Sequence, residues 1–217
     1  RFHGIKQVDG ILADLGVSSH QFDVAERGFS TRFDAELDMR MNQKGDISAY
    51  HVVNEYDEQD IARVLFDYGE LKNARAMANV IVTARKDKEI RNSDELKKVL
   101  AKFLPGHKSN KILAQIYQAI RIEVNQEMDV LKEFLEQSLE ILKPGGRLSV
   151  ISYHSLEDRL VKRFVKNGMF EGEPERDFFG NFEVPFKTIE KLIVPSEEEI
   201  AINNRARSAK LRVAEKI

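Results

Sequence analysis

The chain has 217 residues, of which 42% are hydrophobic and 32% are charged. These proportions are ordinary for a globular protein, and the length suffices for one large domain or two small ones. The formal net charge is −2, so any contact with nucleic acid would have to come from local basic patches. Cysteine is absent, which excludes disulfides and thiolate metal sites, and no apolar run approaches the roughly 18 residues of a membrane span. We therefore expect a soluble, cytoplasmic protein without a membrane partner.

The first predicted element is a buried strand that ends at a carboxylate. Apolar residues within 8–13 lead into Asp14, and Gly16 then breaks the run. Open α/β sheets bind ligands just beyond the carboxyl ends of their parallel strands, so Asp14 is a candidate ligand group. An ordinary exposed aspartate at a strand end is the alternative. The chain starts with Arg1 rather than Met and enters this strand almost at once, which suggests a fragment or a processed chain.

Residues 22–42 show no clear period and are rich in charges and turn formers. Loops longer than about 12 to 15 residues are uncommon in compact domains unless they are functional or disordered. We interpret this segment as a ligand-covering loop, with a disordered loop as the alternative.

From Ser48 to about Leu142, apolar residues recur with a helical period, and Asp57 and Ser93 are the predicted N-caps of two of the helices. About 90 residues of helix exceed the dozen or so that a crossover between parallel strands needs. The sequence therefore predicts an inserted all-helical subdomain, which we assign to residues 43–109, within a core formed by residues 1–42 and 110–217.

A second strand is predicted over residues 148–153, with His154 at its carboxyl end and Ser155 capping the helix that follows. Residues 188–194 and 208–214 are predicted to form an antiparallel pair, because no long helix separates them. Strands alternating with helices predict an α/β fold.

Several common chemistries lack their signatures in this sequence. Neither a G-x-G-x-x-G fingerprint nor a P-loop is present, and the G-x-S-x-G elbow of many hydrolases is also missing. The five histidines show no close metal-ligand spacing, so we expect no metal.

Basic residues are concentrated near the end of the sequence. Arg205, Arg207, Lys210 and Arg212 lie within eight residues, and on a strand Arg205 and Arg207 would share one face. Such a face could follow a nucleic-acid backbone. A solvated surface is the alternative, with about equal weight.

Seven strings of residues, spread in order over essentially the whole chain, resemble the bacterial 16S rRNA (cytosine-N4)-methyltransferase family, RsmH/MraW. They are Asp14-Leu-Gly-Val-Ser-Ser-His-Gln21, Glu26-Arg-Gly-Phe-Ser30, Leu37-Asp-Met-Arg-Met41, Gln118-Ala-Ile-Arg-Ile122, Pro144-Gly-Gly-Arg-Leu148, Ile151-Ser-Tyr-His-Ser-Leu-Glu-Asp-Arg159 and Arg205-Ala-Arg-Ser-Ala-Lys-Leu-Arg212.

This resemblance implies the C-terminal portion of a class I (Rossmann-like) methyltransferase sheet with an inserted helical subdomain. It implies S-adenosylmethionine as cofactor, bound by Asp14 and Gln21, and methylation of the N4 amine of a cytidine in 16S rRNA near the ribosomal P site. The partner would be 16S rRNA or the small ribosomal subunit. The family's N-terminal segment, which carries a glycine-rich S-adenosylmethionine loop, has no counterpart here, and Tyr153 stands where Phe is common in the family.

The candidate residues also suit methyl transfer to the N4 amine of a cytidine. His154, at a strand end, is the candidate catalytic group that contacts the base or takes its proton, and Arg205, Arg207 and Lys210 are candidate rRNA contacts. A non-catalytic RNA- or partner-binding module and an inactive fragment of the enzyme are the alternatives. In the second alternative the opening strand would expose an apolar edge that could support a homodimer.

Overall fold

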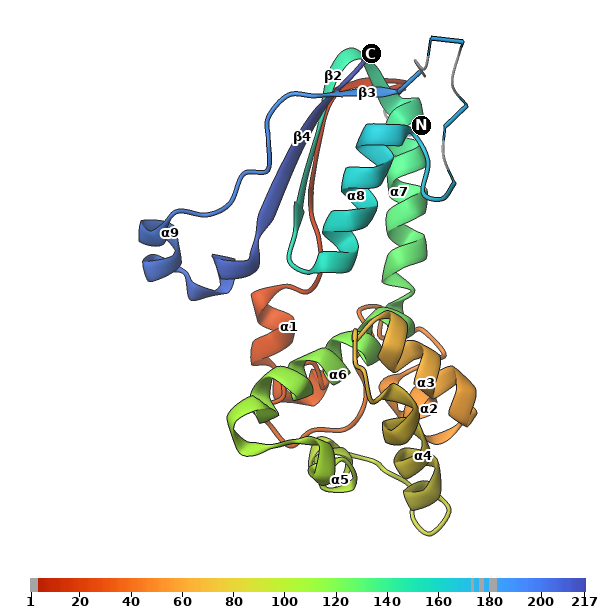
Figure 1. Ribbon diagram of the computed structural model, residues 1–217. Coiled ribbons are helices and arrows are strands. Elements are labelled where there is room, and N and C mark those ends of the chain that lie inside the picture. The colour runs from red at the N-terminus through yellow and green to blue at the C-terminus, as the bar shows by residue number, and fades with distance from the viewer. Residues whose placement is uncertain (1–3, 173, 176–177, 180–182) are drawn as a thin grey trace. The chain divides into compact units, whose positions relative to one another are not determined.

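The computed structural model describes residues 4–172, 174–175, 178–179 and 183–217 (Figure 1). The chain divides into two compact units, which are described separately below. The sheet unit comprises Arg1–Gly16 and Met128–Ile217, and the helical unit comprises Val17–Glu127. Residues 17–42 and 110–127, which the sequence analysis assigned to the core with the strands, are therefore grouped with the helices.

The described strands of the sheet unit form one mixed sheet in the order β1-β2-β4-β3. β1 pairs with β2 in parallel, and β4 runs antiparallel to both β2 and β3, so the predicted antiparallel pair is confirmed. The unit is thus mixed α/β. Its elements are β1 (Val8–Asp14), α7 (Glu127–Ile141), β2 (Leu142–Ser152), α8 (Ser155–Asn167), β3 (Phe186–Thr188), α9 (Glu197–Ile202), the 3-10 helix η4 (Asn204–Ser208) and β4 (Lys210–Lys216).

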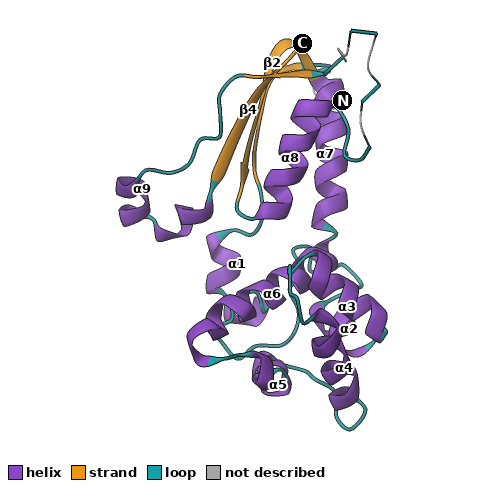
Figure 2. Ribbon diagram, in the orientation of Figure 1, coloured by secondary structure: helices purple, strands orange, loops and turns teal. Residues whose placement is uncertain are grey.

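Helices α7 and α8 supply the apolar layer that covers one face of the sheet (Figure 2). Leu135 of α7 and Phe164 of α8 belong to the same buried cluster as Leu148 and Val150 of β2. Leu148 and Val150 are alternate residues of a strand and therefore point to one face. Each fully buried side chain of this size contributes about 1.5–3 kcal/mol, so the two helices fix the sheet beneath them.

Strand β1 lies at an edge of the sheet. Ile11 and Ala13 pack with the apolar cluster, whereas Leu12, which points to the opposite face, is 72% exposed. Leu12 is thus an exposed apolar side chain on the face of the sheet, and the expected self-association through the edge of β1 stays a prediction.

Two strand boundaries differ from the sequence expectation. Leu142 is the first residue of β2 rather than the last helical position, because α7 already ends at Ile141. β3 spans only Phe186–Thr188, and Ile193 makes an isolated bridge with Leu211. A bend at residues 190–191 interrupts the pairing between these two contacts.

The helical unit packs its helices around one apolar cluster (Figure 1). Asp57 caps α3 through the backbone N–H of Asp60, as predicted. Asn92, rather than Ser93, caps α5, because Ser93 is fully buried and its hydroxyl donates to the carbonyl of Ala35. The elements are α1 (Ser19–Asp23), η1 (Ala25–Arg27), α2 (Ala49–Asn54), α3 (Glu58–Asp67), α4 (Ala74–Arg85), α5 (Ser93–Val99), η2 (Ala101–Phe103), η3 (Gly106–Lys108) and α6 (Ser109–Asn125).

Residues 22–42 form a largely irregular segment, part of which packs into the core of this unit, and its role as a ligand-covering loop stays a prediction. Phe29, Leu37 and Met39 are buried, and Met39 has a φ of 58°, in the left-handed region that non-glycine residues seldom adopt. Asn125 of α6 holds this conformation, because its amide donates to the carbonyl of Met39 at 2.8 Å and accepts from the N–H of Met41 at 2.7 Å.

Within the described residues, none of the helices has the length and apolar character that crossing a membrane requires.

Candidate functional site

The carboxyl ends of the two parallel strands bring together one carboxylate and one phenol. Asp14 is the last residue of β1 and is paired in register with Ile151 of β2. Tyr153 follows the end of β2, and its hydroxyl donates a hydrogen bond to Oδ1 of Asp14 at 2.9 Å. Asp14 is exposed, so its carboxylate can accept a hydrogen bond from a ligand while Tyr153 orients it.

Tyr153 remains a neutral donor over the physiological pH range. Its partial burial disfavours the phenolate, and the carboxylate of Asp14 disfavours it further, so together they raise the pKa of Tyr153 to about 12. Tyr153 was not among the site residues predicted from the sequence. The available signal was its position as the last residue of the strand predicted over 148–153.

A buried carboxylate, Glu157, organises the turn between β2 and α8. Its Oε2 accepts hydrogen bonds from the backbone N–H groups of Tyr153 at 2.9 Å and His154 at 3.3 Å. Only 2% of Glu157 is exposed. In the turn that follows β1, Gly16 has a φ of +83°, and an added Cβ there would meet Oε1 of Glu157 at 4.0 Å. Glu157 therefore lies beside both turns and fixes the backbone from which Tyr153 projects.

His154, the candidate catalytic residue, is the N-cap of α8. Its Nδ1 accepts the backbone N–H of Glu157 at 3.4 Å, and its side chain is only 9% exposed. Nε2 lies 3.1 Å from Oε1 of Glu157 but has no hydrogen-bond partner of good geometry among the described residues. The expected cap, Ser155, is instead the first helical residue. The imidazole thus points into the turn, where it caps the helix.

Asp158, three residues after Ser155 in α8, faces β4. Its carboxylate accepts from Nε of Arg212 at 2.7 Å and lies 3.4 Å from Nζ of Lys210. Burial alone would raise the pKa of Asp158, but the hydrogen bond and charge of Arg212, with the charge of Lys210, hold that pKa below its usual value. Lys210, a candidate RNA contact, is therefore half-buried and paired within the sheet unit.

Arg205 and Arg207 do not lie on a strand, so the expectation that they alternate onto one face is wrong. Both belong to η4, which Asn203 caps by accepting the N–H of Arg205 at 3.2 Å. A 3-10 helix has about three residues per turn, so residues two apart point in different directions. Both arginines are exposed, and Ala206 between them is buried.

Comparison with known proteins decides the family. The MraW methylase family profile matches residues 1–217. The chain belongs to the MraW methylase family.

Three relatives share its sequence over its whole length, and each is named ribosomal RNA small subunit methyltransferase H. The relative from Flavobacterium johnsoniae is 81% identical over 217 residues, which are 100% of this chain and 72% of the relative. The relative from Flavobacterium psychrophilum is 74% identical over 216 residues, with 100% of this chain and 74% of the relative covered. The relative from Bacteroides thetaiotaomicron is 55% identical over 217 residues, with 100% of this chain and 71% of the relative covered.

Members of the MraW methylase family use S-adenosylmethionine, and the exposed groups of this chain suit such a ligand. Asp14 presents a carboxylate that can complement a positively charged ligand. In the helical unit, Gln21 forms a capping box with Ser18, whose backbone N–H donates to the Gln21 side-chain oxygen at 2.8 Å. The NH₂ group of Gln21 is therefore the part of its side chain that is suited to donate to a ligand.

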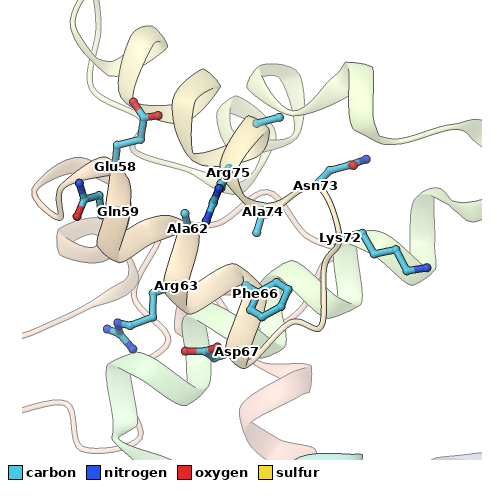
Figure 3. Close-up of a pocket in the computed structure, with 11 residues that line it drawn as sticks. Glu58, Gln59, Ala62, Arg63, Phe66, Asp67, Lys72, Asn73, Ala74 and Arg75 are labelled. Atoms are coloured by element: carbon cyan, nitrogen blue, oxygen red, sulfur yellow. The ribbon is translucent and has the colours of Figure 1, made fainter.

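The helical unit of this MraW-family chain also has an open groove of about 1140 Å³ between α3 and the start of α4 (Figure 3). Phe66, which is 62% exposed, lines the groove with Arg63, Lys72 and Arg75. None of the candidate cofactor or catalytic residues lines it. We therefore do not assign the methyl-transfer site to this groove.

Proposed function

We propose that this MraW-family methyltransferase transfers the methyl group of S-adenosylmethionine to the N4 amine of a cytidine in 16S rRNA near the ribosomal P site. The observation that carries the substrate is the 81% identity, over the whole chain, to a protein named for methylation of small-subunit ribosomal RNA. The cytidine, its N4 atom and the P site come from the resemblance of the sequence strings to the family.

Each candidate residue suits one part of this reaction. S-adenosylmethionine supplies a methyl group that is already activated by its sulfonium. The exocyclic amine of cytosine is a poor nucleophile, because its lone pair is delocalised into the ring, so the protein must align it and accept its hydrogen bond as positive charge develops. Asp14 can hold the cofactor or complement the positive charge of the cofactor. Its position at the carboxyl end of a parallel strand supports this role.

We propose a secondary role for His154. As the buried N-cap of α8 it positions Tyr153 and the turn, and it would contact the base or take its proton only after its side chain rotated out of the turn. Gln21, on α1 of the helical unit, is also proposed to bind the cofactor.

The RNA contacts are proposed on the sheet unit and on the helical region. Arg205 and Arg207 are exposed cations beside β4, and Lys210 remains partly accessible at 35% side-chain exposure. The arrangement of β1 and β2 supports a Rossmann-like core, and we propose that the helical region, 43–109 by the sequence assignment, contacts folded RNA.

A cytoplasmic location follows from an rRNA substrate. The edge position of β1 among the described strands supports a homodimer as its assembly.

Methyl transfer from isotope-labelled S-adenosylmethionine to purified small subunits and to free 16S rRNA tests the function. We expect label in N4-methylcytidine when the rRNA is digested and its nucleosides are separated by mass spectrometry. Label in a different nucleoside would contradict the proposed target atom, and absence of label from rRNA under conditions that sustain S-adenosylmethionine binding would contradict the proposed substrate.

A further inference from the structure

The helical unit contains a long stretch of sequence without any acidic residue. Between Glu95 and Glu123 there is neither aspartate nor glutamate, while five lysines and one arginine occur. They are Lys97, Lys98, Lys102, Lys108, Lys111 and Arg121. Such an asymmetry is local, because the net charge of the whole chain is only −2.

Four of these cations are exposed and lack an internal counter-ion. Lys98, Lys102, Lys108 and Lys111, here called the lysine patch, are all exposed, and within the described part of the chain none of them forms a salt bridge. The other two are neutralised, because Lys97 pairs with Asp94 at 3.1 Å and Arg121 pairs with Glu127 at 2.8 Å. The lysine patch is therefore the part of this stretch that is left for an external anion.

The four lysines occupy one short connection, from the end of α5 to the start of α6 (Figure 1). Lys98 and Lys102 are four residues apart, and Lys108 and Lys111 are three apart. The six residues from Lys102 to Lys108 can span at most about 20 Å even when fully extended. Nζ of Lys102 lies 5.0 Å from the centroid of the Phe103 ring, which directs its stem along the surface. The charges are thus gathered on one region.

The positive potential of this region is not offset by the helix that follows. α6 has 17 residues and no acidic side chain in its first turn, so the positive end of its dipole adds to the charge of Lys108 and Lys111. Like charges three or four residues apart destabilise a helix by a few tenths of a kcal/mol. Some exposed cations of the unit have partners, as Lys88 with Glu95 and Arg63 with Glu123. Other lysines that are unpaired among the described residues, such as Lys44, Lys72 and Lys86, are scattered along the sequence. The lysine patch differs from these because its unpaired charges lie in one stretch that has no acidic residue.

We propose that the lysine patch is a docking surface for the phosphate backbone of the rRNA substrate. Lysine ammonium groups neutralise phosphates as point charges without reading the bases, so the patch would contribute affinity and orientation rather than choice of the cytidine. The proposal rests on the proposed function, because that function supplies RNA as the partner. It goes beyond that function by placing an RNA contact on the α5–α6 connection.

Two triple variants of the intact enzyme test this surface. The patch variant carries Lys102→Gln, Lys108→Gln and Lys111→Gln. The matched control carries Lys6→Gln, Lys187→Gln and Lys191→Gln, three exposed lysines of the sheet unit that lie outside the proposed RNA contacts and change the net charge equally. Affinity for 16S rRNA is measured between about 50 and 200 mM salt. Each lost phosphate contact lowers the slope of log affinity against log salt by about 0.7 to 0.9, so we expect the patch variant to lose about 2 to 3 units of slope.

The control variant is expected to keep most of the wild-type slope, and both variants are expected to keep the wild-type melting temperature and affinity for S-adenosylmethionine. If the patch variant does not fold, the double variant Lys108→Gln, Lys111→Gln replaces it, with an expected loss of about 1.5 units. Equal slopes for patch and control variants, with a wild-type enzyme that methylates rRNA, would overturn the docking surface alone. A wild-type enzyme that neither binds nor methylates rRNA would instead overturn the proposed function.

Discussion

The phenol of Tyr153 and the carboxylate of Asp14 are the most closely linked polar pair at the proposed reaction site. Tyr153 donates to Oδ1 at 2.9 Å, which fixes the plane of the carboxylate and leaves Oδ2 to face a ligand. Because the pKa of Tyr153 is raised to about 12, this donor does not ionise between pH 6 and 9. The pair therefore orients Asp14 independently of pH in that range.

Replacing Tyr153 by Phe should remove this orientation while preserving the ring. A hydrogen bond of this kind contributes about 1 kcal/mol, so we expect kcat/KM for methyl transfer to fall about fivefold. The melting temperature should hardly change, because the lost hydroxyl lies beside an exposed carboxylate.

A double-mutant cycle separates positioning from a direct role of Tyr153. In an Asp14→Ala background, Tyr153→Phe should have no further effect, since the group it orients is gone. A similar loss in both backgrounds would show that Tyr153 acts without Asp14.

At the residue scale, the sequence predicted where polar groups would lie but not how they would pair. Asp14 ends a strand and His154 follows one, as expected. The cap of α8 was assigned to Ser155 because serine is a common N-cap. In the structure, the cap is the preceding residue, His154, whose imidazole accepts the backbone N–H of Glu157 in the first helical turn. Glu157 was missed because a carboxylate in a first helical turn is usually exposed, whereas this one is buried and accepts the backbone N–H groups of Tyr153 and His154.

At the scale of elements, the ion pair between α8 and β4 follows from strand register. Arg212 is paired with Val150 and Lys210 with Ser152, and Val150 faces α8. Both cations therefore point toward the helix and meet Asp158. Because their charges lower the pKa of Asp158, the carboxylate stabilises the folded state above its unfolded pKa of about 3.9, and this contribution is lost as the pH falls through the lower folded pKa.

Asp158→Asn should remove that pH-dependent stabilisation. We expect a loss of about 1.5–3 kcal/mol of unfolding free energy at pH 7, because Arg212 would lose a charged hydrogen-bond partner. The loss should shrink as the pH falls below about 4. Urea unfolding at a series of pH values measures both quantities.

Asp129→Asn serves as the control for this experiment, since Asp129 is 70% exposed and, among the residues that the structure describes, its ion pair is with Lys132 across one helical turn. Its effect should stay below about 0.5 kcal/mol. An equal effect of the two substitutions would show that the α8–β4 ion pair contributes no more to the free energy of unfolding than an exposed ion pair does.

Element types were easier to predict from the sequence than element ends. The helical period predicted the cap of α3 at Asp57, and the lack of a long helix predicted the antiparallel pair. The assignment of Arg205 and Arg207 to a strand failed because Asn203 caps a 3-10 helix there, a local hydrogen bond that alternation of residue types does not reveal.

At the scale of the whole molecule, the limits of sequence reasoning lie in contacts between distant segments. Residues 22–42 have no helical or strand period, so the sequence favoured a loop that covers a ligand. Their order comes from Asn125, 86 residues after Met39, and from burial of Leu37 and Met39 in the helical unit. By contrast, the parallel pairing of β1 with β2 followed from the strand-helix order, and that pairing places Asp14 and Tyr153 together.

The central claim is that methyl transfer takes place at the carboxyl end of β1, with Asp14 as the group that faces the reacting ligands. The direct test is N4-methylcytidine formation in 16S rRNA by the intact wild-type enzyme, by Asp14→Ala and by the control Asp9→Ala, an exposed aspartate of the same strand. The account predicts that kcat/KM falls at least about 100-fold for Asp14→Ala and stays near wild type for Asp9→Ala. Near wild-type activity of Asp14→Ala would contradict the claim.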